Sequence, residues 1–488
     1  MNTILAVDLG GSGMKAALFG DDGAILAEAS AALAFDEDGS GRSEADVGRW
    51  WAALGEVAER LGAEADLAAV TAVAVCGLTR TQVLLDGDGA VLRPAIGFRD
   101  ARAGDVLREA LAGVDHPGTA GLNPFHPLAR LLWVRAHEPS TWAATRLVLE
   151  PKDAINFALT GTARSDAISM HQLLGVMRGD DPLGPRLGIA SSILPPIGTP
   201  TDVVGTVRPG LPGALGRLAG ARVLSGSNDT WTAVAGLGAL TPGRAYCISG
   251  SSEVFGLIAD RAAPAEGLIT LPWGAGMWQI GGPGQNGANA LAFIVDRLAP
   301  GEAPFADRLA ALLAQPVSPE PLLFLPFLHG ERVPHWDADL RAAFVGLSAS
   351  HGPGDMVRAV MEGVAFVNRT VLGRAEAATG CRADEVRIAG GGALSDTWSQ
   401  IRADVLGRPV RTFGGREMGL AGAFAIARVG LGLAPSLAAA ADRSGDSTLF
   451  APSPEAMRRA DALFPLFGKA HDRLADLSRR LARFDDAR

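Results

Sequence analysis

Residues 3–19, TILAVDLGGSGMKAALF, decide the fold class of this chain. Two apolar runs, 3–8 and 14–19, flank a glycine-rich turn, which predicts a β-hairpin whose glycines adopt positive φ. Asp8 ends the first run, so a carboxylate and several backbone N–H groups meet at one sheet edge, an arrangement that suits phosphate and Mg²⁺. Taken alone, the segment is more simply interpreted as an ordinary hairpin turn.

A second hairpin of the same kind is predicted later in the chain. Residues 244–258, RAYCISGSSEVFGLI, fold about Gly250, Ser251 and Ser252. A third glycine-rich segment, residues 390–392, follows a predicted strand and precedes a helix near 395–406, whose N-terminus attracts anions. Three such loops in one chain favour phosphate binding over ordinary turns.

The remaining pattern alternates between strands and helices. Beyond the segments above, strands are expected near 24–34, 69–76, 221–224 and 385–389, and helices near 44–61, 355–378, 417–430 and 454–484. Because a glycine-bearing hairpin opens each half, the sequence predicts two related α/β halves around one cleft. The expected domains are residues 1–240, 241–435 and a helical tail, 436–488.

Composition restricts the class of partner. The chain has 488 residues, a formal charge of −9 and a pI near 5.5, which argues for two domains and against nucleic acid. No window approaches the ~18 uninterrupted apolar residues of a membrane span, so no membrane partner is expected. Cys76, Cys247 and Cys381 are widely separated and fit neither a disulfide framework nor a zinc site, which favours a cytoplasmic location.

Two polar residues follow predicted buried strands. Asp229 lies between a strand and a helix, where it is either a helix N-cap or a general base for a hydroxyl group. Arg80 is either a surface loop residue or a clamp for substrate oxygens. Local sequence leaves both questions open.

Other nucleotide motifs are absent or weak. None of the three lysines, Lys15, Lys152 and Lys469, lies in a P-loop motif. Residues 282–287, GPGQNG, match the dinucleotide-binding pattern, so a nicotinamide-dependent oxidoreductase is an alternative. A lone match is weak evidence in a chain with 62 glycines. A catalytically inactive nucleotide-binding sensor of the actin fold is the other alternative.

Several longer motifs occur together. They are AxFxGL at 342–347, DMxxAVME at 355–362, FLPFLHGERVP at 324–334, and the stretch PKD, LTG and Asp166 within 151–166. With the loops above, they resemble the FGGY carbohydrate kinases, most closely the xylulokinase-like branch. The resemblance covers residues 3 to about 430.

The resemblance implies a two-lobed actin and hexokinase-like (ribonuclease H-like) ATPase fold with duplicated domains around a central cleft. It implies a kinase that uses ATP and Mg²⁺, with Asp229 as general base and Asp8 as metal ligand. The nucleotide-binding residues that it implies are Gly10, Gly11, Ser12, Gly13, Lys15, Gly250, Ser251, Ser252, Gly391, Gly392 and Asp396. The substrate-binding residues are Thr79, Arg80, Asp100, Asn228 and Asp229.

Departures from the family pattern concern the substrate. Thr79-Arg80 stands where xylulokinases have Met-His, and Phe98-Arg99-Asp100 stands for their Trp-Asn-Asp. The substrate is therefore a small ketose, polyol or sugar acid that the sequence does not identify. The oligomeric state is open, with a homodimer as one candidate.

Overall fold

A computed structural model describes residues 2–413, 417–441 and 447–484. The chain divides into two compact units. Unit 1 comprises Met1–Gly236 and Met418–Ala441, and unit 2 comprises Leu237–Glu417 and Asp442–Arg488. Unit 1 is therefore assembled from two separate parts of the sequence.

A six-stranded mixed sheet forms the centre of unit 1. Its strand order is β12-β13-β6-β1-β2-β3, in which β1, β6 and β13 are parallel neighbours and β2, β3 and β12 run antiparallel to theirs. The bounds are β1 Thr3–Leu9, β2 Gly13–Phe19, β3 Ile25–Ala32, β6 Val70–Gly77, β12 Val203–Thr206 and β13 Arg222–Leu224. The predicted hairpin is confirmed, with Asp8 opposite Lys15.

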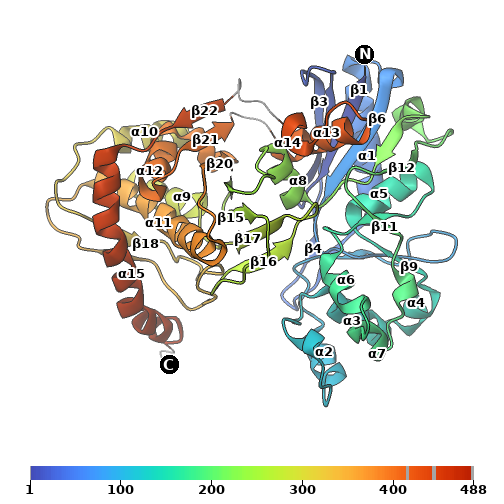
Figure 1. The fold of residues 1–488 in the computed structure, drawn as a ribbon, viewed down its shortest axis with the longest axis horizontal. Coiled ribbons are helices and arrows are strands. Elements are labelled where there is room, and N and C mark those ends of the chain that lie inside the picture. The colour runs from blue at the N-terminus through green and yellow to red at the C-terminus, as the bar shows by residue number, and fades with distance from the viewer. Residues whose placement is uncertain (1, 414–416, 442–446, 485–488) are drawn as a thin grey trace. The chain divides into compact units, whose positions relative to one another are not determined.

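Helices cover both faces of this sheet because its side chains alternate between the faces. Leu5, Val7 and Leu9 pack in one apolar cluster with residues of α1 (Val47–Glu64). On the other face, α8 (Asp229–Gly236) packs with α13 (Met418–Gly430), and Phe19 of β2 stacks on Phe424. Figure 1 shows α13 beside β1 and β6, although most of unit 2 separates them in sequence.

The rest of unit 1 consists of shorter elements. They are β4 Asp36–Glu37, β5 Ser43–Ala45, β7 Val83–Leu85, β8 Ala95–Ile96, β9 Leu147–Leu149, β10 Ser165–Asp166, β11 Ile197–Gly198, α2 Gly104–Ala110, α3 Pro127–His137, α4 Pro139–Ala144, α5 Pro151–Thr160, α6 His171–Met177, α7 Leu183–Arg186 and α14 Leu437–Ala440.

Unit 2 repeats the strand arrangement of unit 1. Its seven-stranded sheet has the order β16-β17-β15-β14-β20-β21-β22, again with an antiparallel hairpin, three parallel neighbours and an antiparallel edge strand. The bounds are β14 Arg244–Ser249, β15 Glu253–Ala259, β16 Ile269–Pro272, β17 Trp278–Pro283, β20 Glu385–Ala389, β21 Val410–Phe413 and β22 Ser447–Phe450, with a small sheet of β18 Leu323–Leu325 and β19 Ala343–Val345. The matching orders agree with the predicted internal duplication.

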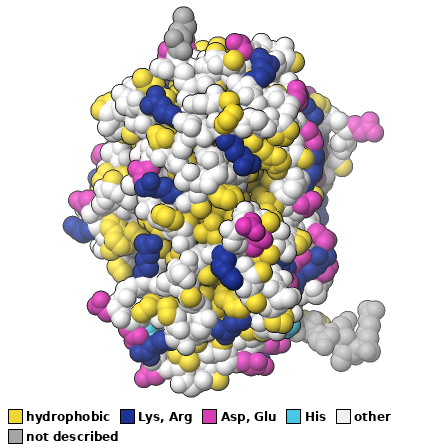
Figure 2. All heavy atoms as spheres, turned by 90° about the vertical axis from the view of Figure 1, so that its right-hand side faces the viewer, with side chains coloured by type: hydrophobic (Ala, Val, Ile, Leu, Met, Phe, Trp, Pro, Cys, Tyr) yellow, Lys and Arg dark blue, Asp and Glu magenta, His cyan; other side chains and the backbone are white. Residues whose placement is uncertain are grey.

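The helices of unit 2 are α9 Ala288–Leu298, α10 Phe305–Leu313, α11 Pro353–Thr379, α12 Asp396–Leu406 and α15 Pro454–Ala482. The last three confirm the helices expected near 355–378, 395–406 and 454–484. None of the helices in the described part of the chain has the length and apolar character that a membrane crossing requires. Figure 2 shows one face of the molecule, where acidic and basic side chains are interspersed among apolar ones.

Candidate active site

Unit 1 brings its predicted polar residues to one edge of its sheet. In register, Asp8 pairs with Cys76 and Leu9 with Gly77, and Gly77 in turn forms a parallel bridge with Asn228. The turn after β1, the loop after β6 and the loop after β13 therefore lie side by side. Since the carboxyl ends of parallel strands form the usual binding edge of an α/β sheet, this edge is the candidate site.

Two carboxylates meet at this edge. Burial raises the pKa of the Cys76 thiol, and the charges of Asp8 and Asp229 raise it further. Both carboxylates therefore lie within electrostatic range of the same thiol. Asp8 also lies against the first turn of α13, because a Cβ added at Gly419 would be 2.2 Å from Asp8 Oδ2. The N-terminus of a helix favours a negative charge at that position.

The turn between β1 and β2 differs from the prediction in one respect. Gly10, Gly11 and Gly13 do not have positive φ. The glycines at its two ends are instead needed for close approach, since a Cβ would lie 3.2 Å from Gly13 O at Gly10 and 3.0 Å from Ala31 O at Gly13. The exposed turn residues Gly11 and Ser12 present little besides backbone, which leaves room for a phosphate.

Asp229 is the first residue of α8, but it is not the residue that caps this helix. The side-chain Oδ1 of Asn228 accepts a hydrogen bond from Trp231 N at 2.9 Å. Asp229 Oδ1 accepts one from Thr230 N at 2.6 Å. Burial raises the pKa of Asp229, while the hydrogen bonds from Thr230 and the charge of Arg80 oppose the rise. The helix therefore does not need Asp229 as its cap.

A buried ionic network supports the loop that carries Asp229. Lys152 Nζ forms ion pairs with Asp153 and with Asp166, the latter at 3.0 Å, and donates to Ser225 O at 3.2 Å. Burial acts against the ammonium ion, but the two carboxylates outweigh it and raise the pKa of Lys152. Asp166 Oδ1 in turn accepts from Ser227 Oγ at 3.0 Å. The PKD motif thus holds this loop in position, a role that the sequence analysis did not predict.

Gly226, within the same loop, has a φ of +68°, and a Cβ there would lie only 1.9 Å from Val75 O. The loop can therefore pass over β6 only with glycine at this position.

Arg80 follows β6 in a left-handed conformation, with a φ of +51°. Such a conformation costs a non-glycine residue about 1–3 kcal/mol and persists where its surroundings enforce it. The anchor is Arg130, whose Nη1 donates to Arg80 O at 2.6 Å. Burial lowers the pKa of Arg80, and the nearby carboxyl groups of Glu150 and Asp229 oppose the lowering. Arg80 is therefore held near Asp229 at the same edge, next to Thr79.

The side chain of Asp100 forms hydrogen bonds with other residues of unit 1. Its Oδ2 accepts hydrogen bonds from Ser43 N at 2.9 Å and from Arg102 Nη2 at 2.7 Å. Those contacts occupy much of its acceptor capacity, and a role in substrate binding stays a prediction.

Unit 2 presents a corresponding edge. β14 and β20 are parallel neighbours, with Ile248 opposite Ala389, so the turn 250–252 and the segment 390–392 follow adjacent strand ends. The segment 390–392 packs against Ser249, the last residue of β14, because a Cβ at Gly392 would lie 2.1 Å from Ser249 Oγ. Gly391 faces open space. Asp396 begins α12 beyond this segment and is exposed.

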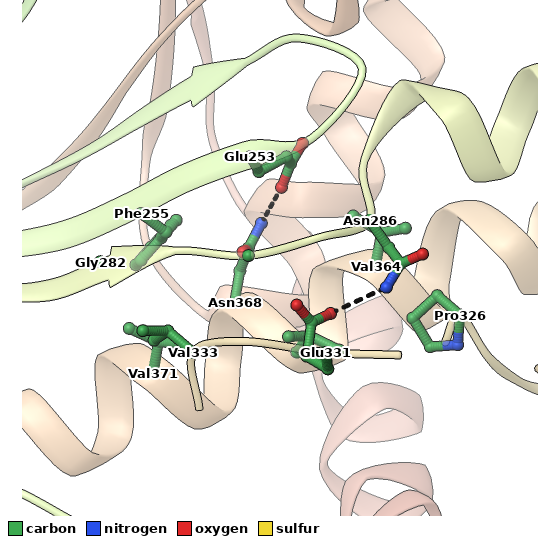
Figure 3. Close-up of a pocket in the computed structure, with 12 residues that line it drawn as sticks. Glu253, Phe255, Gly282, Asn286, Pro326, Glu331, Val333, Val364, Asn368 and Val371 are labelled. Atoms are coloured by element: carbon green, nitrogen blue, oxygen red, sulfur yellow. Dashed lines mark hydrogen bonds between the residues drawn. The ribbon is translucent and has the colours of Figure 1, made fainter. Parts of the chain in front are cut away.

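Arg402 supports these two loops. Its guanidinium pairs with Glu253 and donates to Ser249 Oγ and Gly392 O, each at 2.9 Å. Glu253 also borders a cavity of about 10 Å³, room for about one water and too small for a nucleotide. Figure 3 shows that Asn368 bonds to Glu253 in this cavity.

The GPGQNG motif lies against the turn 250–252. Ala288 N, directly after the motif, donates to Gly250 O at 3.1 Å, and Asn289 N donates to Ser251 O at 3.0 Å. A Cβ at Gly287 would lie 3.0 Å from the carbonyl carbon of Ser252. Close packing on the hairpin turn therefore accounts for the glycine that ends this motif.

The described residues do not form a magnesium site by themselves. Among residues 2–413, 417–441 and 447–484, no three His, Cys, Asp or Glu side chains converge as metal ligands. Mg²⁺ in kinases needs only one or two carboxylates, because phosphate oxygens and waters complete its shell. Asp8, at a sheet edge beside a turn of small residues, fits that requirement.

Comparison with known proteins decides the family. The N-terminal domain model of the FGGY family of carbohydrate kinases matches residues 3–236, and the C-terminal domain model matches residues 245–431. The chain belongs to the FGGY family of carbohydrate kinases. The two-domain fold of actin and hexokinase-like sugar kinases is thereby confirmed, and neither the nicotinamide-dependent oxidoreductase nor the inactive sensor is supported.

Relatives of this FGGY kinase include enzymes with different named substrates. It is 29% identical to the xylulose kinase of Escherichia coli over 87% of this chain and 89% of that one. It is 24% identical to the gluconokinase of Bacillus subtilis over 95% and 94%. The xylulose kinase structure from Rhodospirillum rubrum superposes with a TM-score of 0.84 at 26% identity, over 98% of this chain and 100% of that one. The chain is accordingly a sugar kinase of xylulose kinase-like type.

Proposed function

We propose that this kinase transfers the γ-phosphoryl group of ATP to a hydroxyl of a small ketose, polyol or sugar acid, with Asp229 as general base. The observation that carries the proposal is that Asn228 caps α8, so that Asp229 stands at the sheet edge without a capping role. Its pKa, raised by burial, makes it a better proton acceptor than an exposed aspartate.

The proposed reaction is a single displacement. Asp229 takes the proton of the substrate hydroxyl, the hydroxyl oxygen forms a bond to the γ-phosphorus, and the bond from that phosphorus to the β–γ bridging oxygen breaks to release ADP. Mg²⁺, held through Asp8, would neutralise charge on the phosphates. Positioning matters most in such a transfer, and the network around Lys152 supplies it for the base.

The two units are proposed to have different tasks. In unit 1, Thr79, Arg80, Asp100, Asn228 and Asp229 would bind the sugar, and Asp8, Gly10 to Gly13 and Lys15 would bind the metal and phosphates. In unit 2, Gly250, Ser251, Ser252, Gly391, Gly392 and Asp396 would bind the nucleotide. The exposed backbone at Gly391 supports that assignment. A cytoplasmic location and a homodimer stay predictions.

The test is Asp229→Asn, assayed by coupled ADP release and by thermal unfolding. We expect kcat to fall at least about 100-fold, while nucleotide binding and Tm stay near wild type, since a positioned base contributes about 10²–10⁴ in rate. The matched control is Asp46→Asn, because Asp46 caps α1 through Gly48 N and asparagine caps equally well. Turnover of Asp229→Asn within threefold of wild type would refute the assignment.

A further inference from the structure

The guanidinium of Arg80 lies near the proposed base, Asp229. Among the described residues, no hydrogen bond or ion pair engages the guanidinium of Arg80, although burial lowers its pKa. Glu150 and Asp229 act on its charge without forming an ion pair with it. The five N–H donors of this partly enclosed guanidinium are therefore available to a ligand.

The other charged groups around Arg80 are already engaged or neutral. Arg130 donates to the backbone carbonyls of Arg80, Ile96, Gly97 and Phe125, so its guanidinium is used within the fold. Burial raises the pKa of Glu150 to about 8, with a further contribution from Asp153, so its carboxyl group is mostly protonated at pH 7. Glu150 and Asp229 are thus the carboxyl groups that act on the charge of Arg80, and neither forms an ion pair with it.

Two histidines near Arg80 add neutral hydrogen-bonding groups. Burial lowers the pKa of His126 to about 4 and lowers that of His171. His126 Nδ1 accepts from Leu128 N at 3.1 Å, which leaves the proton on its Nε2. His171 Nδ1 lies 2.9 Å from Ile168 O and donates to it, which leaves its Nε2 as an acceptor. One donor and one acceptor of this kind suit the hydroxyl groups of a sugar.

We propose that the substrate is a small sugar acid, an aldonate or ketoaldonate, whose carboxylate pairs with Arg80 while one of its hydroxyls faces Asp229. This inference rests on the proposed kinase function and narrows its substrate class. A carboxylate supplies a charge-assisted, bidentate partner for the planar guanidinium, which a neutral ketose or polyol cannot supply. An arginine that only ordered neutral hydroxyls would leave the bidentate geometry of its guanidinium unused.

The test uses the full chain with ATP and Mg²⁺ in a coupled ADP-release assay. Tetronates, pentonates, hexonates and their 2-keto forms are each compared with the alditol and ketose of the same chain length. We expect kcat/KM for the best acid to exceed that of its neutral counterpart at least tenfold.

The decisive variant is Arg80→Gly. Because glycine adopts positive φ without strain, this variant should fold at least as stably as wild type, which a thermal melt checks. Its kcat/KM for the acid should fall at least tenfold, and by more than its kcat/KM for the neutral sugar of the same chain length, with KM for ATP within threefold of wild type. Arg80→Lys should retain part of the preference, since lysine keeps the charge and loses the planar fork.

The outcomes separate the two proposals. A neutral ketose or polyol that is a better substrate than every acid overturns the sugar-acid inference and leaves the kinase function standing. No ADP from any compound overturns the kinase function. Calorimetric titration of the same acids without ATP then decides the inference alone. Binding to wild type but not to Arg80→Gly supports it, and no binding to wild type overturns it.

Discussion

Replacing Lys152 with methionine tests whether the buried network holds the catalytic loop. Lys152 is 1% exposed, and its partners Asp153 and Asp166 are 0% exposed. Methionine fills a similar volume but leaves two carboxylates in the core without their counter-ion. Breaking a buried ion pair from one side costs about 3–5 kcal/mol, and we expect a loss of that size in the unfolding free energy of unit 1. Because Ser225 O also loses this donor and keeps only Asn156 Nδ2, at 3.0 Å, kcat should fall as well.

The assay is urea unfolding followed by tryptophan fluorescence, beside a kinase assay. Lys469→Met is the matched control, since Lys469 is exposed on α15 and a surface change is usually worth within about 0.5 kcal/mol. The pH dependence adds a second check. Burial raises the pKa of Asp153 and the charge of Lys152 opposes the rise, so without the ammonium ion the folded-state pKa of Asp153 lies further above its unfolded value of about 3.9. The folded variant then binds protons that the unfolded chain releases, so its deficit should shrink as the pH falls from about 8 to about 5.5.

A rescue variant sharpens the result. If uncompensated charge causes the loss, Lys152→Met combined with Asp166→Asn should be more stable than Lys152→Met alone. A loss below 1 kcal/mol for Lys152→Met, equal at both pH values, would refute the view that this ion network holds the loop.

Two other predictions test the surroundings of the site. Burial raises the folded-state pKa of Glu150 to about 8, against about 4.3 in the unfolded chain. The stability that the protonated carboxyl group contributes is therefore lost as the pH rises from about 4.3 to about 8. Glu150→Gln should raise Tm relative to wild type much more at pH 9 than at pH 5, and parallel Tm curves would contradict this. Gly226→Ala should lower Tm sharply, because its Cβ would meet Val75 O at 1.9 Å, whereas Gly175→Ala in α6, with nothing within 4 Å, should leave Tm unchanged or slightly higher.

The sequence predicted the strands, turns and helices of this site better than the side chains that hold them in position. Both hairpins and the helices that begin at Asp229 and Asp396 follow from short-range patterns, which periodicity and turn residues report directly. Lys152 could not be predicted to support residues 225–229, because some seventy residues separate them and only the fold brings them together. The PKD motif drew attention to Lys152 but did not indicate that Lys152 holds the loop that carries Asp229.

The sequence also does not determine which of two adjacent residues caps a helix. Asn228 and Asp229 are equally good N-caps by type, and the choice between them depends on the backbone path out of β13. In the first hairpin, the sequence correctly predicted that Gly10 and Gly13 stand where a larger residue does not fit. The reason is close packing against neighbouring backbone, and not the positive φ that the sequence analysis expected. Sequence alone does not distinguish these two uses of glycine.

The route of the chain through unit 1 has a consequence for biosynthesis. Helix α13, whose residues from Met418 to Ala427 are buried, covers β1 and β6 and lies against Asp8. The ribosome must therefore translate most of unit 2, from Leu237 to Glu417, before unit 1 receives the helix that completes its core. Until then the nascent N-terminal part exposes an apolar sheet face, a state that invites aggregation or chaperone binding. A fragment that ends at residue 236, where the N-terminal family model stops, would remain in that state permanently.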